Sequence, residues 1–154
     1  AMLNEDRGDL AAALALHRQS LAMRRKVFSK EHPMTLTALV NVARVSLQTG
    51  EVAAALPLAE DAAKLADRVY AAAPNGRHAS TFATLAEARL ATGDAAGAAT
   101  AMRRADMLLA RLDQPAPSVA TYLQKVRARL CAAAISAACS ANASPATSAR
   151  VQSG

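Results

Sequence analysis

The chain has 154 residues, of which 53% are hydrophobic and 19% are charged, so it is apolar enough to bury a core and unlike a disordered polymer. Aromatic residues make up only 3%, and alanine runs supply much of the apolar content, which favours closely packed helices and excludes a sheet-rich fold. The formal net charge of +6 predicts acidic partners, with nucleic acid as the alternative to a protein.

Targeting segments and cysteines give information about the cellular compartment of the protein. No charged and then apolar segment opens the sequence, and no apolar run reaches the ~20 residues that a membrane span requires. Cys131 and Cys139 are eight positions apart in one expected helix, about two turns, which separates their backbones too far for a disulfide. We therefore expect free thiols and a cytoplasmic protein.

A phrase of glycine followed by an acidic residue occurs three times, at Gly8, Gly50 and Gly93, which are 42 and 43 residues apart. A fixed period of this length is typical of stacked helical units. Glycine suits the left-handed end of one helix, and the acidic residue suits the positive start of the next. Each unit is therefore predicted to be a helix, a tight turn and a second helix, with a turn at Gly8 as well.

The predicted elements in chain order follow from these turns and from the breaker-rich segments between units. Apolar residues at helical spacing flank Gly50 on both sides, which predicts two amphipathic helices in that unit. We expect helical repeats over residues 1–112, divided into a partial first unit, a second and a third: residues 1–30, 34–72 and 78–112.

The last predicted helix has no glycine turn and no partner phrase. Ser118 is expected to cap it, and it would run over residues 118–139 and cover the exposed side of the stack. Residues 140–154 are rich in Ser, Ala and Pro without an apolar period, which predicts a disordered tail. The predicted fold is all-α, a short right-handed α-solenoid of antiparallel helix pairs with a C-terminal capping helix.

The stretch "LAMRRKVFSKEHPMTLTALVNVARVSLQTG" resembles the tetratricopeptide repeat (TPR) family, in the 42-residue variant of kinesin light chain and of many bacterial signalling proteins. The family pattern is met by Ala43, Leu47, Gly50, Ala62 and Pro74. The resemblance implies a protein–protein interaction scaffold. Because Ala1 falls where the first helix of a unit ends, we expect the chain to be the C-terminal part of a larger bacterial signalling or regulatory protein.

The resemblance also implies a binding site. In the family, the first helices of the units line a concave groove that holds a partner's peptide segment. Asn41 is the sharpest candidate, because its amide both donates to and accepts from a peptide bond. The competing interpretation makes Asn41 and Arg44 ordinary solvent-facing residues of an amphipathic helix. The full set of groove candidates is Thr37, Asn41, Arg44, Gln48, Ser80, Thr84 and Glu87.

Catalysis is poorly supported by the sequence. No nucleophile, base and orienting partner share a helical spacing, and His17, His32 and His78 fall in different units. No set of three ligands has metal-binding spacing, and there is no glycine-rich phosphate loop. We predict neither an enzyme nor a site for a cofactor or metal.

Two further partner hypotheses rest on surface residues. Leu10, Leu14 and Leu21 would lack part of their cover in a truncated first unit, which predicts self-association. The alternative to a peptide groove is a basic helical module for nucleic acid, with one basic surface formed by Arg24, Arg25, Lys26, Arg103, Arg104, Lys125, Arg127 and Arg129.

Overall fold

A computed structural model describes the backbone of residues 2–133 and the side chains of residues 8–133. Within these residues the chain forms α-helices and no strand, which confirms the all-α prediction. Residues 134–154, which include the end of the predicted capping helix and the predicted tail, lie outside the described residues. The helices are α1 (Met2–Val27), α2 (Pro33–Gln48), α3 (Val52–Val69), α4 (Gly76–Ala91), α5 (Ala95–Ala110) and α6 (Pro117–Ala132).

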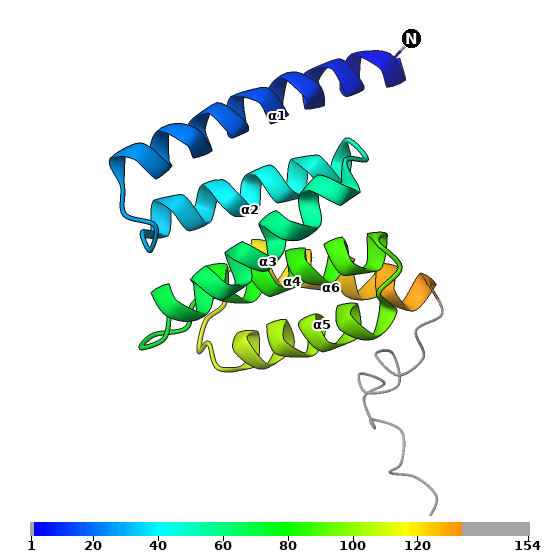
Figure 1. Cartoon of the computed structure of the whole chain (residues 1–154). Coiled ribbons are helices and arrows are strands. Elements are labelled where there is room, and N and C mark those ends of the chain that lie inside the picture. The colour runs from blue at the N-terminus through cyan, green and yellow to red at the C-terminus, as the bar shows by residue number, and fades with distance from the viewer. Residues whose placement is uncertain (1, 134–154) are drawn as a thin grey trace, which may run out of the picture.

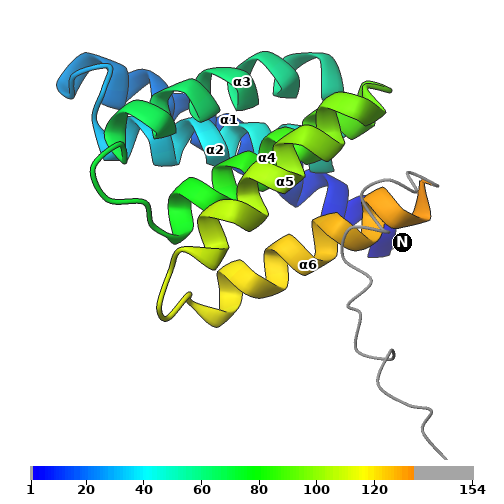
Figure 2. The ribbon, with the colours of Figure 1, turned by 90° about the horizontal axis from the view of Figure 1, so that it is seen from below.

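The helices form a stack of antiparallel neighbours (Figure 1). Each helix from α1 to α5 packs against the next one along the chain, and α6 packs against both α4 and α5 (Figure 2). In addition, α2 contacts α4, and α4 contacts α6, so these three helices lie on the same side of the stack. The predicted α-solenoid of helix pairs is therefore confirmed.

The turns within the two complete pairs have the predicted backbone conformation. Gly50 and Gly93 have φ angles of 83° and 85°, in the left-handed region that glycine adopts readily. The threonine before each glycine adds a bond to the preceding helix: Thr49 Oγ1 donates to the Ser46 carbonyl at 3.1 Å, and Thr92 Oγ1 donates to the Arg89 carbonyl at 2.9 Å. The helix end and the reversal are thus built by the same short segment.

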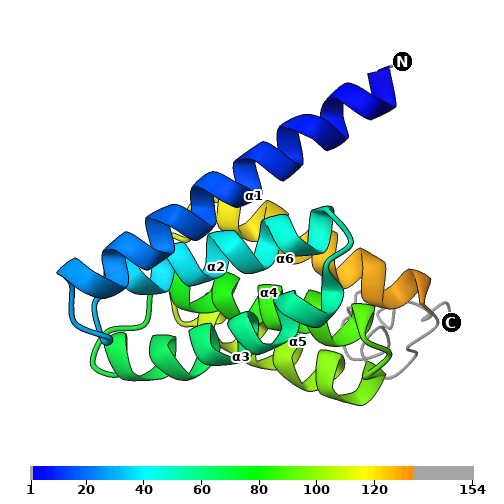
Figure 3. The same cartoon turned by 45° about the horizontal axis from the view of Figure 1, so that its top comes forward.

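The predicted turn at Gly8 is wrong. Helix α1 runs without interruption from Met2 to Val27, and Gly8 is not among the described glycines with positive φ. The residue before Gly8 is Arg7, a good helix former, where the other two phrases have the turn-stabilising threonine. The N-terminal half of α1 consequently projects past the other helices as a straight extension (Figure 3).

Alanine fills the interfaces between helices. Ala43, Ala86 and Ala105 have no exposed surface, and Ala62 has 1%. Such small side chains allow two helix backbones to approach closely, as the sequence predicted for Ala43, Ala62 and Ala86. Larger residues complete the core, with Leu36 and Leu108 almost completely buried.

Helix α1 is attached to α2 by the leucines that were predicted to lack cover. Leu14 and Leu21 are only 3% and 6% exposed and belong to the same buried cluster as Leu36 and Leu39 of α2. The expectation that Leu14 and Leu21 lack cover is wrong, because the face of α1 that carries them is the face that packs on α2. Leu10 is half-buried, and self-association itself stays a prediction.

Helix α6 begins one residue earlier than predicted. Ala116 is the N-cap residue, and Pro117 occupies the first turn, so Ser118 lies inside the helix and does not cap it. Proline suits this place because its fixed φ is helical and its missing N–H would have no partner there. Leu123, Val126 and Leu130 are fully buried against the rest of the stack.

Two sequence-based statements about the chemistry and membrane association of the chain can be compared with the structure. Cys131 is disulfide-bonded, so the prediction of a free thiol there is wrong. The prediction assumed one helix through both cysteines, but α6 ends at Ala132, and Cys139 lies outside the described residues.

Among residues 2–133, every helix is too short or too polar to span a bilayer.

Candidate functional site

A cleft of about 300 Å³ lies between the three helices that share one side of the stack, α2, α4 and α6. Helices α2 and α6 each contribute several side chains at spacings that keep them on one helix face, and α4 contributes Glu87. We call this the inner cleft. Its lining residues are Arg44, Leu47, Gln48, Glu87, Tyr122, Lys125 and Arg129.

Tyr122 is the centre of the hydrogen bonding in the inner cleft. Its hydroxyl donates to Glu87 Oε2 at 2.9 Å and lies 3.0 Å from Thr84 Oγ1, which itself donates to the Ser80 carbonyl. Burial, and then the negative charge of Glu87, raise the pKa of the Tyr122 phenol well above its ordinary range. The phenol therefore remains a hydrogen-bond donor at all physiological pH values.

Glu87 is held between two donors. Arg129 forms an ion pair with Glu87 Oε1, and Tyr122 donates to the other carboxylate oxygen. The Glu87 side chain is 11% exposed, against 66% for Arg129. Its charge and its hydrogen bonds are thus satisfied within the protein, and its carboxylate is the fixed centre of the cleft rather than a free acceptor.

Arg44 and Lys125 are the cations of the inner cleft that have no carboxylate partner within the described part of the chain. The Arg44 guanidinium lies over the Tyr122 ring, 4.3 Å from its centroid, an arrangement that orients a cation without neutralising it. Both side chains are exposed. The cleft therefore presents two positive charges without a carboxylate partner, of which Arg44 is oriented by the Tyr122 ring, beside the paired charge of Arg129.

The structure brings together three of the seven predicted groove residues, because Arg44, Gln48 and Glu87 line the inner cleft. Thr84 lies directly beneath it but is 1% exposed, and its hydroxyl is occupied by the Ser80 carbonyl and Tyr122. Thr84 is consequently placed to support Tyr122 and not to touch a ligand.

The other three predicted residues lie outside the inner cleft. Thr37 and Ser80 flank Arg77 near the starts of α2 and α4: Arg77 donates to Thr37 Oγ1 at 2.7 Å, and Ser80 Oγ donates to the Arg77 carbonyl. Asn41 is half-buried and makes no side-chain hydrogen bond to the described residues. One end of the predicted groove therefore carries Thr37, Arg77 and Ser80, and the other end is the inner cleft. Asn41 lies on α2 between these two ends.

Sequence reasoning assigned Tyr122, Lys125 and Arg129 to a capping helix and missed them as lining residues of the cleft. Their spacing of three and four residues is the same as that from Asn41 to Arg44 and from Arg44 to Gln48. That shared spacing is the signal that would have identified α6 as a third groove helix.

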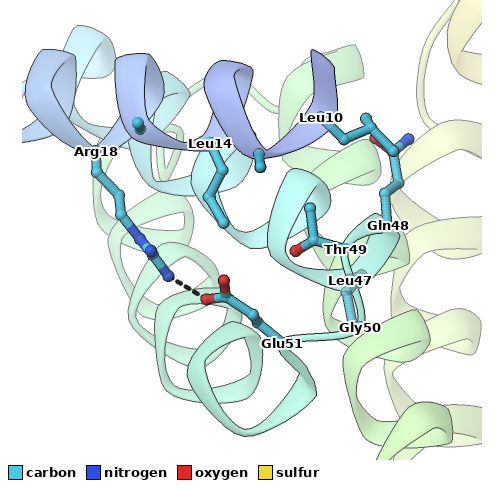
Figure 4. A pocket seen from close by; sticks show the side chains of 10 residues that line it. Leu10, Leu14, Arg18, Leu47, Gln48, Thr49, Gly50 and Glu51 are labelled. Carbon is cyan, nitrogen blue, oxygen red and sulfur yellow. Dashed lines mark hydrogen bonds and ion pairs between the residues drawn. The ribbon is translucent and has the colours of Figure 1, made fainter. Parts of the chain in front are cut away.

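A second and larger cleft, of about 570 Å³, lies where α1 projects past the α2–α3 turn (Figure 4). Leu10 and Leu14 extend toward the turn from α1, and Arg18 closes one end through its ion pair with Glu51. Since the charges of Arg18 and Glu51 already compensate each other, this cleft offers fewer unsatisfied groups to a polar ligand than the inner cleft does.

The eight basic residues of the nucleic-acid hypothesis do not share one cleft. Lys125 and Arg129 line the inner cleft, whereas Arg25 lines a separate hollow of about 430 Å³ with residues of α2 and α3. Arg104 is paired with Asp67, and Arg127 with Asp106. Partial neutralisation and dispersal weaken the continuous positive strip that a phosphate backbone requires.

The described residues contain no cluster of three or more His, Cys, Asp or Glu side chains that would hold a metal ion. The buried His78 is 3% exposed and lies 2.8 Å from Asp67 through Nε2, between the rings of Tyr70 and Phe82. This packing assigns His78 to the junction of α3 and α4.

Comparisons with known proteins agree with this architecture. A tetratricopeptide repeat family model matches residues 1–68. Two crystal structures of nearly identical TPR-like repeats, from a Podosopora anserina protein described as a kinesin light chain, have the same fold as this chain. One, a single-substitution variant, is 19% identical with a TM-score of 0.63, over 90% of this chain and 71% of that chain. The other is 18% identical with a TM-score of 0.65, over 91% and 72%.

No curated protein matches the sequence. The family model covers less than half of the 154 residues, and the solved structures share the helical repeat fold of this chain. The bacterial signalling context, the 42-residue variant and the cytoplasmic location remain predictions from the sequence.

Proposed function

We propose that the chain is a scaffold that binds a peptide segment of a protein partner along α2, α4 and α6, and that this segment is acidic where it crosses the inner cleft. The observation that carries the proposal is the pair of cleft cations Arg44 and Lys125, which have no carboxylate partner within the described residues. Thr37, Asn41, Ser80 and Arg77 extend the polar surface toward the other end of α2 and α4.

The geometry favours a carboxylate between Arg44 and Lys125. Tyr122 and Glu87 are fixed by their own hydrogen bonds, so the cleft is organised before a ligand arrives. A pre-organised site loses less conformational entropy on binding than one that must be ordered. Charged groups of this kind contribute to specificity and association rate, so binding should weaken as the salt concentration rises.

A display library of random peptides selected against the chain tests the proposal. We expect enrichment of Asp and Glu, and at least a tenfold loss of affinity, about 1.4 kcal/mol, in the double variant Arg44→Ala, Lys125→Ala. The matched control is Arg103→Ala, Lys64→Ala, which removes one exposed arginine and one exposed lysine outside the inner cleft. Selected peptides that bind both double variants equally well, or that show no acidic preference, would contradict the proposal.

A further inference from the structure

Exposed apolar side chains concentrate on one face of α1. Leu16, Met23 and Val27 are 66%, 65% and 74% exposed, and they account for three of the five large hydrophobic side chains that are exposed among the described residues. They are separated by seven and four positions, the spacing of one face of a helix. This face lies away from α2, on which Leu14 and Leu21 pack.

The same face is free of charge over its central length. Ala12, Gln19 and Ser20 fall between or beside the three apolar residues at helical spacing, and the charged residues of the helix lie on its flanks or ends. Arg18 is turned toward Glu51, and Arg24 donates to the Met34 carbonyl. The uncharged stripe from Ala12 to Val27 is about 22 Å long at 1.5 Å per residue. We call it the α1 stripe.

We propose that the α1 stripe is a homodimer interface, in which α1 of one copy packs antiparallel against α1 of a second copy. A two-fold axis at the middle of the stripe places Leu16 opposite Met23 of the second copy and Ala12 opposite Val27 of the second copy. The polar pair Gln19 and Ser20 then meets its own equivalent at the axis. A two-fold interface requires this kind of self-complementarity, since the same patch serves both copies.

Charge at the two ends of the stripe is complementary to that of a second copy in the antiparallel orientation. The antiparallel arrangement brings Asp9 of one copy to the end of the helix where Lys26 and Lys30 of the other copy lie. A parallel arrangement would bring each of these charges beside its own equivalent, and like charges repel. The stripe thus disfavours a parallel partner and accepts an antiparallel one.

The size of the α1 stripe limits the expected affinity of the dimer. One helix pair buries less surface than the roughly 1,200–2,000 Å² of a standard stable interface, so we expect a dimer that dissociates at micromolar concentration. The inner cleft lies on α2, α4 and α6, and the stripe on α1, so dimerisation leaves the cleft open. The two proposals are therefore tested separately.

Sedimentation equilibrium over a range of chain concentrations tests the dimer. We expect reversible dimerisation that Leu16→Glu, Met23→Glu abolishes, with far-UV circular dichroism unchanged because both side chains are exposed. The matched control is Met107→Glu on α5, where the methionine is 59% exposed, and it should leave the dimer intact.

A charge exchange tests the antiparallel orientation. Asp9→Lys should weaken the dimer at least about tenfold, the ratio that corresponds to 1.4 kcal/mol. Adding Lys26→Asp and Lys30→Asp to that variant should restore it. A chain that stays monomeric at all concentrations, a dimer that survives the Leu16 and Met23 substitutions, or a charge exchange that fails to restore dimerisation would overturn the proposal.

Discussion

The segments Thr92-Gly93-Asp94 and Arg7-Gly8-Asp9 are nearly the same phrase, yet the first reverses the chain and the second continues a helix. At Gly93 the φ angle is 85°, Thr92 binds the preceding carbonyls, and Asp94 Oδ1 accepts from the Gly97 N–H at 2.9 Å. No threonine precedes Gly8, and α1 runs straight through it.

The difference between Gly93 and Gly8 shows that a glycine allows a turn but does not by itself cause one. Glycine lowers the cost of positive φ, but it also occupies a helix at a cost of about 1 kcal/mol relative to alanine. That small cost is outweighed when the flanking residues supply no alternative hydrogen bonds. At Gly50 and Gly93 the alternative is supplied by the threonine and by the packing of two antiparallel helices across the turn.

The largest effect is expected at the two turns. Gly50→Ala and Gly93→Ala each introduce a Cβ that meets no atom within 4 Å, so the cost comes from the positive φ alone. We expect each substitution to lower the free energy of unfolding by about 1–2 kcal/mol. Urea denaturation followed by circular dichroism measures this change. Stability equal to that of the unmodified chain would show that these glycines do not need the left-handed conformation.

The caps after the two turns are expected to differ. Asp94 caps α5 through Gly97, whereas Glu51 makes no side-chain cap to α3 and is paired with Arg18 on the surface. Asp94→Ala should therefore cost about 1 kcal/mol, and Glu51→Ala should cost little, as exposed ion pairs do. Thermal unfolding of the two variants side by side checks the ranking, and the reverse order would contradict it.

Gly8→Ala should have the opposite sign from the turn substitutions. Gly8 lies inside α1, and a Cβ there meets no atom within 4 Å. Replacement by alanine should raise the free energy of unfolding by about 0.5–1 kcal/mol, provided that α1 unfolds together with the stack. The measurement is again urea denaturation, and a loss of stability would indicate that Gly8 adopts a turn after all.

The smallest net effect is expected at Gly97, where two opposing terms meet. A Cβ at Gly97 would lie 1.9 Å from Asp94 Oδ2, so alanine displaces the capping carboxylate while improving helix propensity. We expect Gly97→Ala to be close to neutral in the unmodified chain and stabilising by about 0.5–1 kcal/mol in an Asp94→Ala background. A double-mutant cycle measures this coupling, and additive effects would exclude the contact.

The sequence predicted only some of the residues that line the inner cleft. Arg44, Gln48 and Glu87, which the family resemblance implies as groove residues, line the inner cleft, and their role in binding stays a prediction. Tyr122, Lys125 and Arg129 were missed because their sequence segment has no glycine turn and no partner phrase, the features by which units were recognised. The burial of Thr84 beneath Tyr122 depends on a side chain 38 positions further along, which local periodicity does not reveal.

The sequence by itself determined the helices, the two glycine turns and the small alanine interfaces, because each depends on residues within a few positions of one another. Only the tertiary structure decided that Leu14 and Leu21 are covered and that α6 completes the inner cleft. Those outcomes depend on which helix faces meet. Residues that are distant in sequence control that contact, through the surface they bury and the hydrogen bonds they supply.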